Sequence, residues 1–580
     1  MKLTKQVLCL VLALLLLVGT VGCQTAPATT QSQNKLVPGA TTATTTTTAG
    51  ETEPTYIIRP TSPSFTLPNV PSGTTPTQPD APEKEPLVFE LTQAHVDDYY
   101  LLLDECEQLA LAGLDMDAVE AKFEALDELY NFLYAQNSIA SVMYYANMKD
   151  ETLKEQHLHT TNLCTDANDA YIQMTRRVYL SDTPAKETLF EGWSEQDIMF
   201  LMSYNEQVVQ LNKRNAAIVV EYQNTKDETT RIELYKEMVI NNNQIAQIYG
   251  YENYYFYASE LVCRRDYSAD EMALIRQYGR DYLADLYATA LKTFRKNYNR
   301  LSSAKQKSVN AFLNNDYTSI RTDHIGNYLA VMPDTMETHI QQMIQQDSLF
   351  TKDTNAMGGA FTISVGERSY CFFGPGYASL ATVIHEGGHY YASRYNKLNS
   401  IPLDLAETHS QANEWLFLAY LDGKFADNEY QCVLDYRLVN DLSTILVCLM
   451  VDEFEQQVYA SDVTNFTAKD FKDLMNGIVA EYFDPEYAAT DFGDMNGYWP
   501  QVVVDHPVYY LSYAVSAITA MDLYTIAVED FAGATEIYRK LCEEPVLEAG
   551  FLGNIRAAGL AGPFDENFYL ELKKIIDGRA

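Results

Sequence analysis

The stretch His385-Glu386-Gly387-Gly388-His389 is the most informative part of this 580-residue chain, and its pattern is H-E-x-x-H. Residues four apart on a helix share one face, so both imidazoles can bind the same metal ion. Glu386 follows the first histidine, where a carboxylate can accept a proton from a water molecule held by that ion. The stretch therefore predicts a zinc site on a helix, of the kind that supports hydrolysis.

The residues around the motif favour a buried helix. Apolar and aromatic side chains flank it on both sides, namely Leu380, Val383, Ile384, Tyr390, Tyr391 and Tyr395. Gly387 and Gly388 each cost roughly 1 kcal/mol in a helix relative to alanine. Because they have no side chain, another backbone can approach closely. We therefore expect tight packing behind a cleft.

Catalytic zinc needs a third protein ligand and an open position. A metzincin would have glycine and histidine where this chain has Ala392 and Tyr395, which excludes that class. The next candidates follow Pro402, in a segment with a helical pattern. We predict that Glu407 is the third ligand, together with His385 and His389.

Glu407, Ser410, Gln411 and Glu414 share one face of that predicted helix. A carboxylate behind a ligand imidazole orients it and raises its basicity. We therefore predict that Glu414 supports a ligand histidine. His409 points elsewhere on the helix, and we interpret it as a structural or supporting residue.

These residues resemble the oligoendopeptidase F and thimet oligopeptidase family of zinc metallopeptidases, which are gluzincins. The resemblance covers about residues 240–515 in separate segments: 245–254, 358–361, 370–373, 407–415 and 452–455. It implies a mostly α, two-lobed, zincin-like helical fold with a deep central groove and a small β-sheet next to the zinc-site helix. It also implies one Zn²⁺ per chain.

A second segment runs from His506 to Tyr513 and contains three tyrosines. It resembles the His- and Tyr-rich segment of oligoendopeptidase F and the Tyr-x-x-Tyr-x-x-Ser stretch of angiotensin-converting enzyme. By that match Tyr513 stabilises the oxyanion of the tetrahedral intermediate, and His506 and Tyr510 bind substrate or intermediate. The alternative is that these tyrosines only pack in the core, because most of the 42 tyrosines of the chain are expected to do so.

We expect zinc-dependent endopeptidase activity on short unfolded peptides. The substrate would extend along an edge strand near 370–373, and the backbone of Gly359 and Ala360 would hold it. Two alternatives stay open. One is a dipeptidyl carboxypeptidase or carboxypeptidase, which needs a cationic residue for the substrate carboxylate. The other is an inactive surface lipoprotein that only binds peptides.

The N-terminus predicts export. Residues 1–22 have a basic start and a short apolar run, as in a signal peptide. Cys23 follows small residues, which resembles a bacterial lipobox and implies lipidation; an ordinary secretory signal is the alternative. The Thr- and Pro-rich residues 23–86 predict a disordered tether. We expect a protein anchored by lipid on the extracellular face of a bacterial membrane.

Residues 87–580 are expected to be globular, with an N-terminal helical region at 87–330 and a catalytic region at 331–580. Helical periodicity is clear over 123–144, 197–222 and 235–260, and strand signals cluster near 360–373. The net charge of −38 disfavours nucleic acid as a partner, although it also serves solubility. Seven of the nine cysteines lie beyond Cys23, and their odd number and wide scatter argue against a dense disulfide framework.

Overall fold

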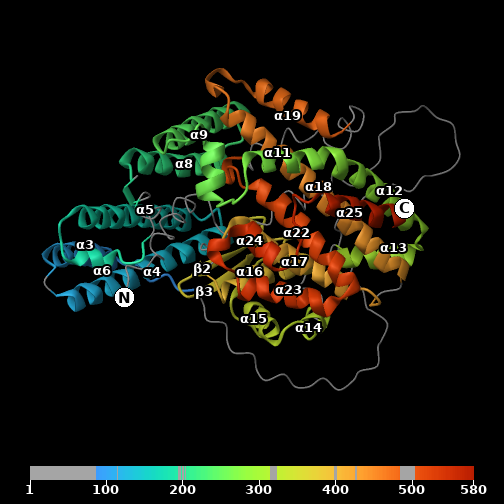
Figure 1. Cartoon of the computed structure of the whole chain (residues 1–580), viewed down its shortest axis with the longest axis horizontal. Helices are drawn as coiled ribbons and strands as arrows, with labels where there is room; N and C mark the ends of the chain where they lie inside the picture. The colour runs from blue at the N-terminus through green and yellow to red at the C-terminus, as the bar shows by residue number, and fades with distance from the viewer. Residues whose placement is uncertain are drawn as a thin grey trace.

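The computed structural model describes residues 87–113, 115–193, 198, 201–202, 204–313, 323–396, 401–424, 427–483 and 503–579. This part of the chain is mostly α-helical and contains one small sheet, which confirms the predicted fold class (Figure 1). The predicted signal peptide, Cys23 and the whole predicted tether lie outside the described residues.

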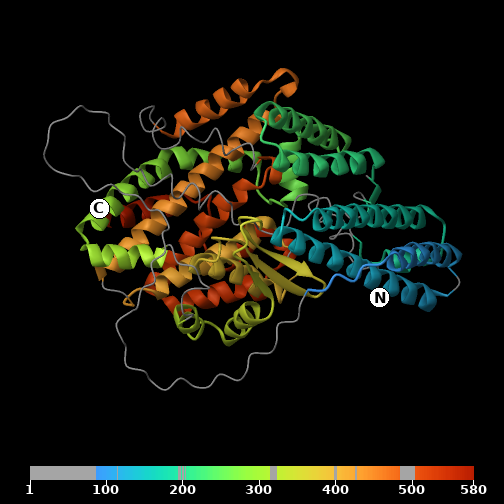
Figure 2. The same cartoon turned by 180° about the vertical axis from the view of Figure 1, so that it is seen from behind.

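The first helices form one end of the molecule, drawn in blue to teal in Figures 1 and 2. They are α3 (Gln93–Ala112), α4 (Met116–Ala146), α5 (Glu151–Leu180) and α6 (Ala185–Leu189). Side chains at helical spacing, such as Tyr99, Leu126 and Ala167, are fully buried between them and form a separate core. These helices therefore make up one lobe.

The next helices lead into the larger part of the fold. They are α8 (Glu206–Asn224), α9 (Glu228–Ile248), α10 (Tyr254–Tyr257), α11 (Ala269–Tyr278), α12 (Ala284–Arg300), α13 (Ser303–Leu313), α14 (Asp323–Leu329) and α15 (Asp334–Gln345), with π-helical turns at Ala258–Val262 and Gly279–Leu283. The helical pattern over 235–260 is divided into shorter helices, of which α9 is the first. This helix stops at Ile248, because Gly250 adopts a φ of +82°, and Asn253 caps a new start.

The C-terminal helices include the one that carries the H-E-x-x-H motif. They are α16 (Leu380–Ser393), α17 (Leu403–Tyr420), α18 (Asp427–Tyr459), α19 (Ala468–Tyr482), α22 (Tyr510–Glu529), α23 (Phe531–Glu543), α24 (Gly550–Ala557) and α25 (Glu566–Arg579), with 3₁₀ turns at Val463–Asn465 and Leu547–Ala549. Among the described residues, α22 alone is long and apolar enough to cross a membrane, but 72% of its apolar window is buried inside the protein. It is therefore the central helix of the core.

The sheet has three strands in the order β1-β3-β2: β1 (Ser348–Phe350), β2 (Ala360–Val365) and β3 (Arg368–Phe373). β3 runs parallel to β1 and antiparallel to β2, with Thr362 opposite Cys371. The expectation of an edge strand at 370–373 is therefore wrong. The three-residue β1 pairs with the outer side of β3, which leaves β2 at the edge that faces α4.

The first main hydrophobic core ends at Leu201 along the chain, and the second begins at Ile218. The change from one core to the other therefore lies upstream of the predicted boundary at residue 330. Helices from α8 onward share the core of the motif helices because their apolar faces pack against α18 and its neighbours. All seven cysteines in the described part of the chain are buried and free, as expected for core residues.

Candidate metal centre

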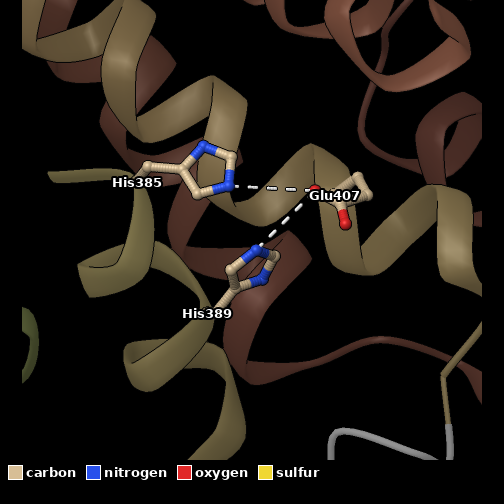
Figure 3. Close-up of side chains that lie close together, drawn as sticks. All are labelled: His385, His389 and Glu407. Carbon is tan, nitrogen blue, oxygen red and sulfur yellow. Dashed lines mark ion pairs between the residues drawn. The ribbon is translucent and has the colours of Figure 1, made fainter. Parts of the chain in front are cut away.

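The motif histidines lie on α16, which begins after Ser379. The Ser379 side chain caps the helix by accepting a hydrogen bond from the Thr382 backbone N–H at 3.1 Å. His385 and His389 are buried and point the same way, because they are four residues apart. Figure 3 shows both rings facing Glu407.

Glycine at position 388 allows the neighbouring helix to come close. A Cβ atom there would lie 2.4 Å from the carbonyl oxygen of His409 and 2.7 Å from Cα of Ser410, both on α17. Only glycine fits such an approach. The two helices are therefore close enough for the Glu407 carboxylate to reach both imidazoles.

Three ligand-type atoms converge at this point. Oε2 of Glu407 lies 3.9 Å from Nε2 of His385 and 3.7 Å from Nε2 of His389. Both Nε2 atoms are buried without a hydrogen-bond partner. Tetrahedral zinc with bonds of about 2.0–2.1 Å holds its ligand atoms about 3.4 Å apart. The residues present therefore fit a zinc ion after a small contraction.

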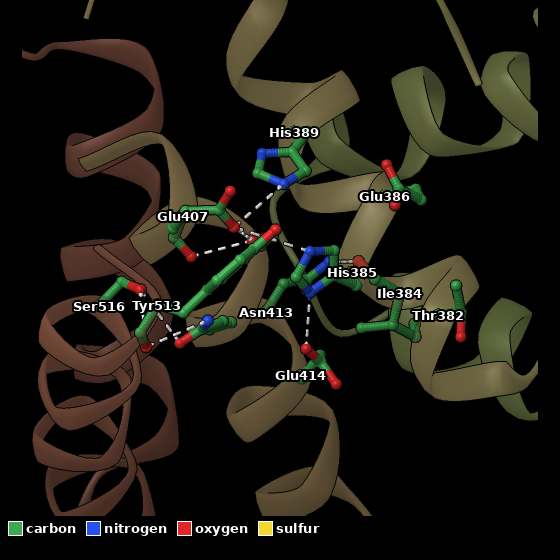
Figure 4. Close-up of polar contacts among 12 residues, drawn as sticks. Thr382, Ile384, His385, Glu386, His389, Glu407, Asn413, Glu414, Tyr513 and Ser516 are labelled. Atoms are coloured by element: carbon green, nitrogen blue, oxygen red, sulfur yellow. Dashed lines mark hydrogen bonds and ion pairs between the residues drawn. The ribbon is translucent and has the colours of Figure 1, made fainter. Parts of the chain in front are cut away.

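Glu414 supports the first histidine from the opposite side. Its Oε1 lies 2.7 Å from Nδ1 of His385 (Figure 4). Its Oε2 accepts a hydrogen bond from Arg437. Burial opposes ionisation of Glu414, but Arg437 and His385 outweigh this effect and lower its pKa. An ionised Glu414 holds the Nδ1–H tautomer of His385 and leaves Nε2 for a metal.

Glu386 points away from this triad toward the sheet. Its Oε2 accepts a hydrogen bond of 2.7 Å from Oγ1 of Thr362 on β2, whereas its buried Oε1 has no hydrogen-bond partner. Burial raises the pKa of Glu386 to about 8. Its arrangement suits a group that takes and returns a proton near neutral pH.

The predicted C-terminal residues lie beside the triad, although their contacts differ from the expectation. The hydroxyl of Tyr509, which the sequence analysis assigned no role, donates a hydrogen bond of 2.6 Å to Oε1 of Glu407. Its ring centroid lies 5.4 Å from that of His506 and 5.2 Å from that of Tyr513. Tyr509, Tyr510 and Tyr513 lie so close together in the sequence that no local pattern distinguishes Tyr509 as the one that contacts Glu407.

His506 and Tyr510 complete this aromatic group. Both ring nitrogens of His506 are buried without a hydrogen-bond partner, and burial lowers its pKa to about 4. The imidazole is therefore neutral at physiological pH. The Tyr510 ring centroid lies 5.6 Å from that of Tyr513.

Two other predicted positions have different surroundings. Gly359 and Ala360 lie at the start of β2, where the Gly359 carbonyl already accepts a hydrogen bond of 2.8 Å from the Gly374 N–H. His409 turns away from the triad, and its Nε2 lies 2.9 Å from the Leu541 carbonyl oxygen. It therefore ties α17 to α23.

Comparison with solved structures identifies the architecture. Pz peptidase A, solved with an inhibitor, matches with a TM-score of 0.65 at 16% identity, over 84% of this chain and 98% of the other. This chain has the oligoendopeptidase F fold. A Bacillus anthracis protein assigned as an oligoendopeptidase F matches with a TM-score of 0.64 at 15% identity, over 86% and 97% of the two chains.

Oligoendopeptidase F from Enterococcus faecium matches more loosely, with a TM-score of 0.51 at 13% identity, over 84% of this chain and 98% of the other. No protein-family model and no curated protein sequence matches the chain. The likeness to the oligoendopeptidase F fold therefore lies in the architecture, which extends over nearly all of each solved chain.

Proposed function

We propose that the protein is a zinc-dependent endopeptidase that hydrolyses short unfolded peptides outside the cell. The convergence of two unpartnered imidazole nitrogens on one carboxylate oxygen carries this proposal. His385, His389 and Glu407 would hold the zinc ion. The presence of all three residues, with Glu386 beside them, weighs against a site that only binds peptides.

Zn²⁺, when bound, supplies a Lewis acid that lowers the pKa of a water molecule and polarises the scissile carbonyl. Glu386 accepts the proton of the attacking water on Oε1 and later passes it to the leaving amine. Thr362 restrains this base by holding its other oxygen. The raised pKa of Glu386, which burial causes, favours the protonated carboxyl that this transfer to the amine requires.

The aromatic group on the other side of the triad provides donors for the oxyanion. In our proposal the Tyr513 hydroxyl donates a hydrogen bond to the oxygen that gains charge, and His506 assists with one ring N–H. Tyr510 binds the peptide. His506 is suited to this role because burial keeps it neutral, with one N–H to donate.

The peptide would lie along β2, which is an edge strand of the sheet. Gly359 and Ala360 would offer main-chain groups at its start. Recognition through main-chain hydrogen bonds selects for an extended peptide backbone and depends little on the side chains of the peptide. The lipid anchor at Cys23 and the tether at 23–86 would keep the enzyme on the extracellular face of the membrane.

Glu386→Gln tests this proposal. We expect the variant to keep its zinc and to lose peptide cleavage by a factor of roughly 10² to 10⁴, because it can no longer accept the proton. The assay uses internally quenched peptides blocked at both ends, and metal analysis runs in parallel. Glu367→Gln, an exposed site in the β2–β3 turn, is the matched control.

Unchanged cleavage by Glu386→Gln would contradict the mechanism. A wild-type enzyme that leaves blocked peptides intact but cleaves those with a free C-terminus would instead indicate an exopeptidase. The first assay therefore tests the role of Glu386 as the base, and the second tests whether the enzyme is an endopeptidase.

A further inference from the structure

One bulky residue beside the candidate site adopts a backbone conformation that it normally avoids. Val508 has a φ of +62°, in the left-handed region. The only other non-glycine residue with positive φ among the described residues is Arg264, at +54°. A β-branched side chain is strained in this region, and it persists only when its surroundings impose it.

Two buried side chains impose this conformation on Val508. Glu455, on α18, accepts a hydrogen bond of 2.8 Å from the Val508 N–H. Arg265, the residue after Arg264, donates a hydrogen bond of 2.8 Å from Nη2 to the Val508 carbonyl. Both backbone polar groups of Val508 are thus held by elements far away in sequence.

Arg265 also connects this point to the helices that carry the site. Its Nη2 donates to Oγ of Ser512 at 3.1 Å, and its Nε lies 3.9 Å from Oδ1 of Asp404. Asp404 lies one helical turn before Glu407 on α17, and Ser512 is on α22. The guanidinium therefore fixes the start of α22 relative to the metal-ligand helix.

The next residue after Val508 is Tyr509, whose hydroxyl donates to Glu407. Relaxation of Val508 to a negative φ would turn the chain at this point and move the phenol. We propose that Glu455 and Arg265 are positioning residues, which hold Val508 in the left-handed conformation and thereby direct the Tyr509 hydroxyl to Glu407. This inference rests on the proposed peptidase function.

Glu455 would act through its oxygen acceptor and not through charge. Burial raises the pKa of Glu455 well above its usual range and so disfavours its charged form. Glutamine has the same shape and retains an acceptor oxygen. Methionine has a similar length and no good acceptor. The pair Glu455→Gln and Glu455→Met therefore separates the hydrogen bond from the packing.

We expect Glu455→Met to lower kcat on the order of 10- to 100-fold with zinc content unchanged, because a misplaced group near the site costs about this much. Glu455→Gln should retain most of the activity. Glu453→Met is the matched control, because Glu453 lies on the same helix but contacts Arg280 at 2.7 Å. It should leave kcat unchanged.

A double-mutant cycle with Tyr509→Phe shows whether Glu455 acts through the tyrosine. In that background Glu455→Met should cost little further activity. Full additivity of the two losses would overturn the proposal, and so would equal losses in Glu455→Gln and Glu455→Met. If Glu455→Met is insoluble, Glu455→Asp takes its place, because aspartate is one methylene shorter and moves the acceptor oxygen away from Val508. Glu455→Asp should then show the same non-additivity with Tyr509→Phe.

Hydrogen exchange provides a readout that needs no catalysis. Amides in the peptide 503–513 should exchange faster in Glu455→Met than in Glu455→Gln, whose rates should match the wild type. Absence of peptide cleavage by the wild-type protein would contradict the proposed function alone. Equal exchange in all three proteins would contradict the positioning role alone.

Discussion

Nδ1 of His385 lies 2.7 Å from Oε1 of Glu414, and this contact turns Nε2 of the same ring toward Glu407. Glu414 is itself held by Arg437, which forms a second ion pair of 3.0 Å with Asp441. His385, a candidate metal ligand, therefore lies at the end of a row of charged side chains that are largely buried. Such support fixes the tautomer and the orientation of a metal-binding histidine.

Glu414→Gln should weaken zinc binding by roughly 10- to 100-fold, because a neutral amide orients the His385 ring less firmly. Competition with a chromophoric chelator measures the affinity. Asp441→Asn, which acts one step further along this row of charged side chains, should have a smaller effect. Equal zinc affinity in Glu414→Gln and the wild type would show that His385 needs no such support.

Glu407→Ala and His409→Ala should differ sharply although they lie two residues apart. Glu407→Ala removes one of the three convergent ligand atoms, so zinc content after dialysis should fall to near zero. His409→Ala should keep its zinc, because that ring faces Leu541 on α23, and should lose thermal stability instead. Retained zinc in Glu407→Ala would disprove its assignment as the third ligand.

The two glycines of the motif should respond in opposite ways to alanine. Gly388→Ala places a Cβ 2.4 Å from the His409 carbonyl and should cost about 3 kcal/mol of stability or more. Gly387→Ala meets only the Ile340 side chain, whose terminal Cδ1 at 3.2 Å is its nearest atom, and gains up to about 1 kcal/mol of helix propensity. Urea unfolding of both variants measures the contrast. Comparable destabilisation by the two would mean that α16 and α17 do not pack this closely.

His157 in the N-terminal lobe should make stability depend on pH. Burial lowers its pKa from 6.5 to about 4, and its Nδ1 lies 3.1 Å from Oγ of Ser141. Between these two values the unfolded chain binds a proton that the folded protein excludes. The stability contributed by neutral His157 is therefore complete above pH 6.5 and is lost as the pH falls toward 4, with a slope of at most about 1.4 kcal/mol per pH unit.

His157→Gln should flatten this acid limb in denaturant melts recorded at several pH values. His159→Gln, at an exposed position on the same helix, serves as the matched control and should leave the slope as in the wild type. A His157→Gln protein with an unchanged acid limb would show that other groups dominate it.

Local patterns were enough to predict much of the site. Residues four apart on a helix share a face whatever the rest of the fold does, so His385 and His389 were predictable from spacing alone. Glu407 and Glu414 followed in the same way, because they are separated by about two helical turns on α17. The mostly helical fold followed from the periodicity of apolar residues.

Contacts between distant segments were not predictable in this way. The three-residue β1 carries too little pattern to be recognised, and its pairing with β3 decided which strand forms the sheet edge. The break after Ile248 depended on a glycine and a capping asparagine within a strongly helical pattern. The position at which one hydrophobic core gives way to the other depended on which helices α8 and the helices after it pack against.

The sequence by itself therefore determined the helices, the H-E-x-x-H motif and the order of candidate ligands along the chain, because these depend on spacing within one element. Only the tertiary structure decided that Thr362 restrains Glu386, that Tyr509 bonds Glu407 across 102 residues, and that Glu455 and Arg265 hold Val508 in its left-handed conformation. Each of these contacts joins separate elements, and their relative placement is set by the packing of the whole core and not by any local pattern.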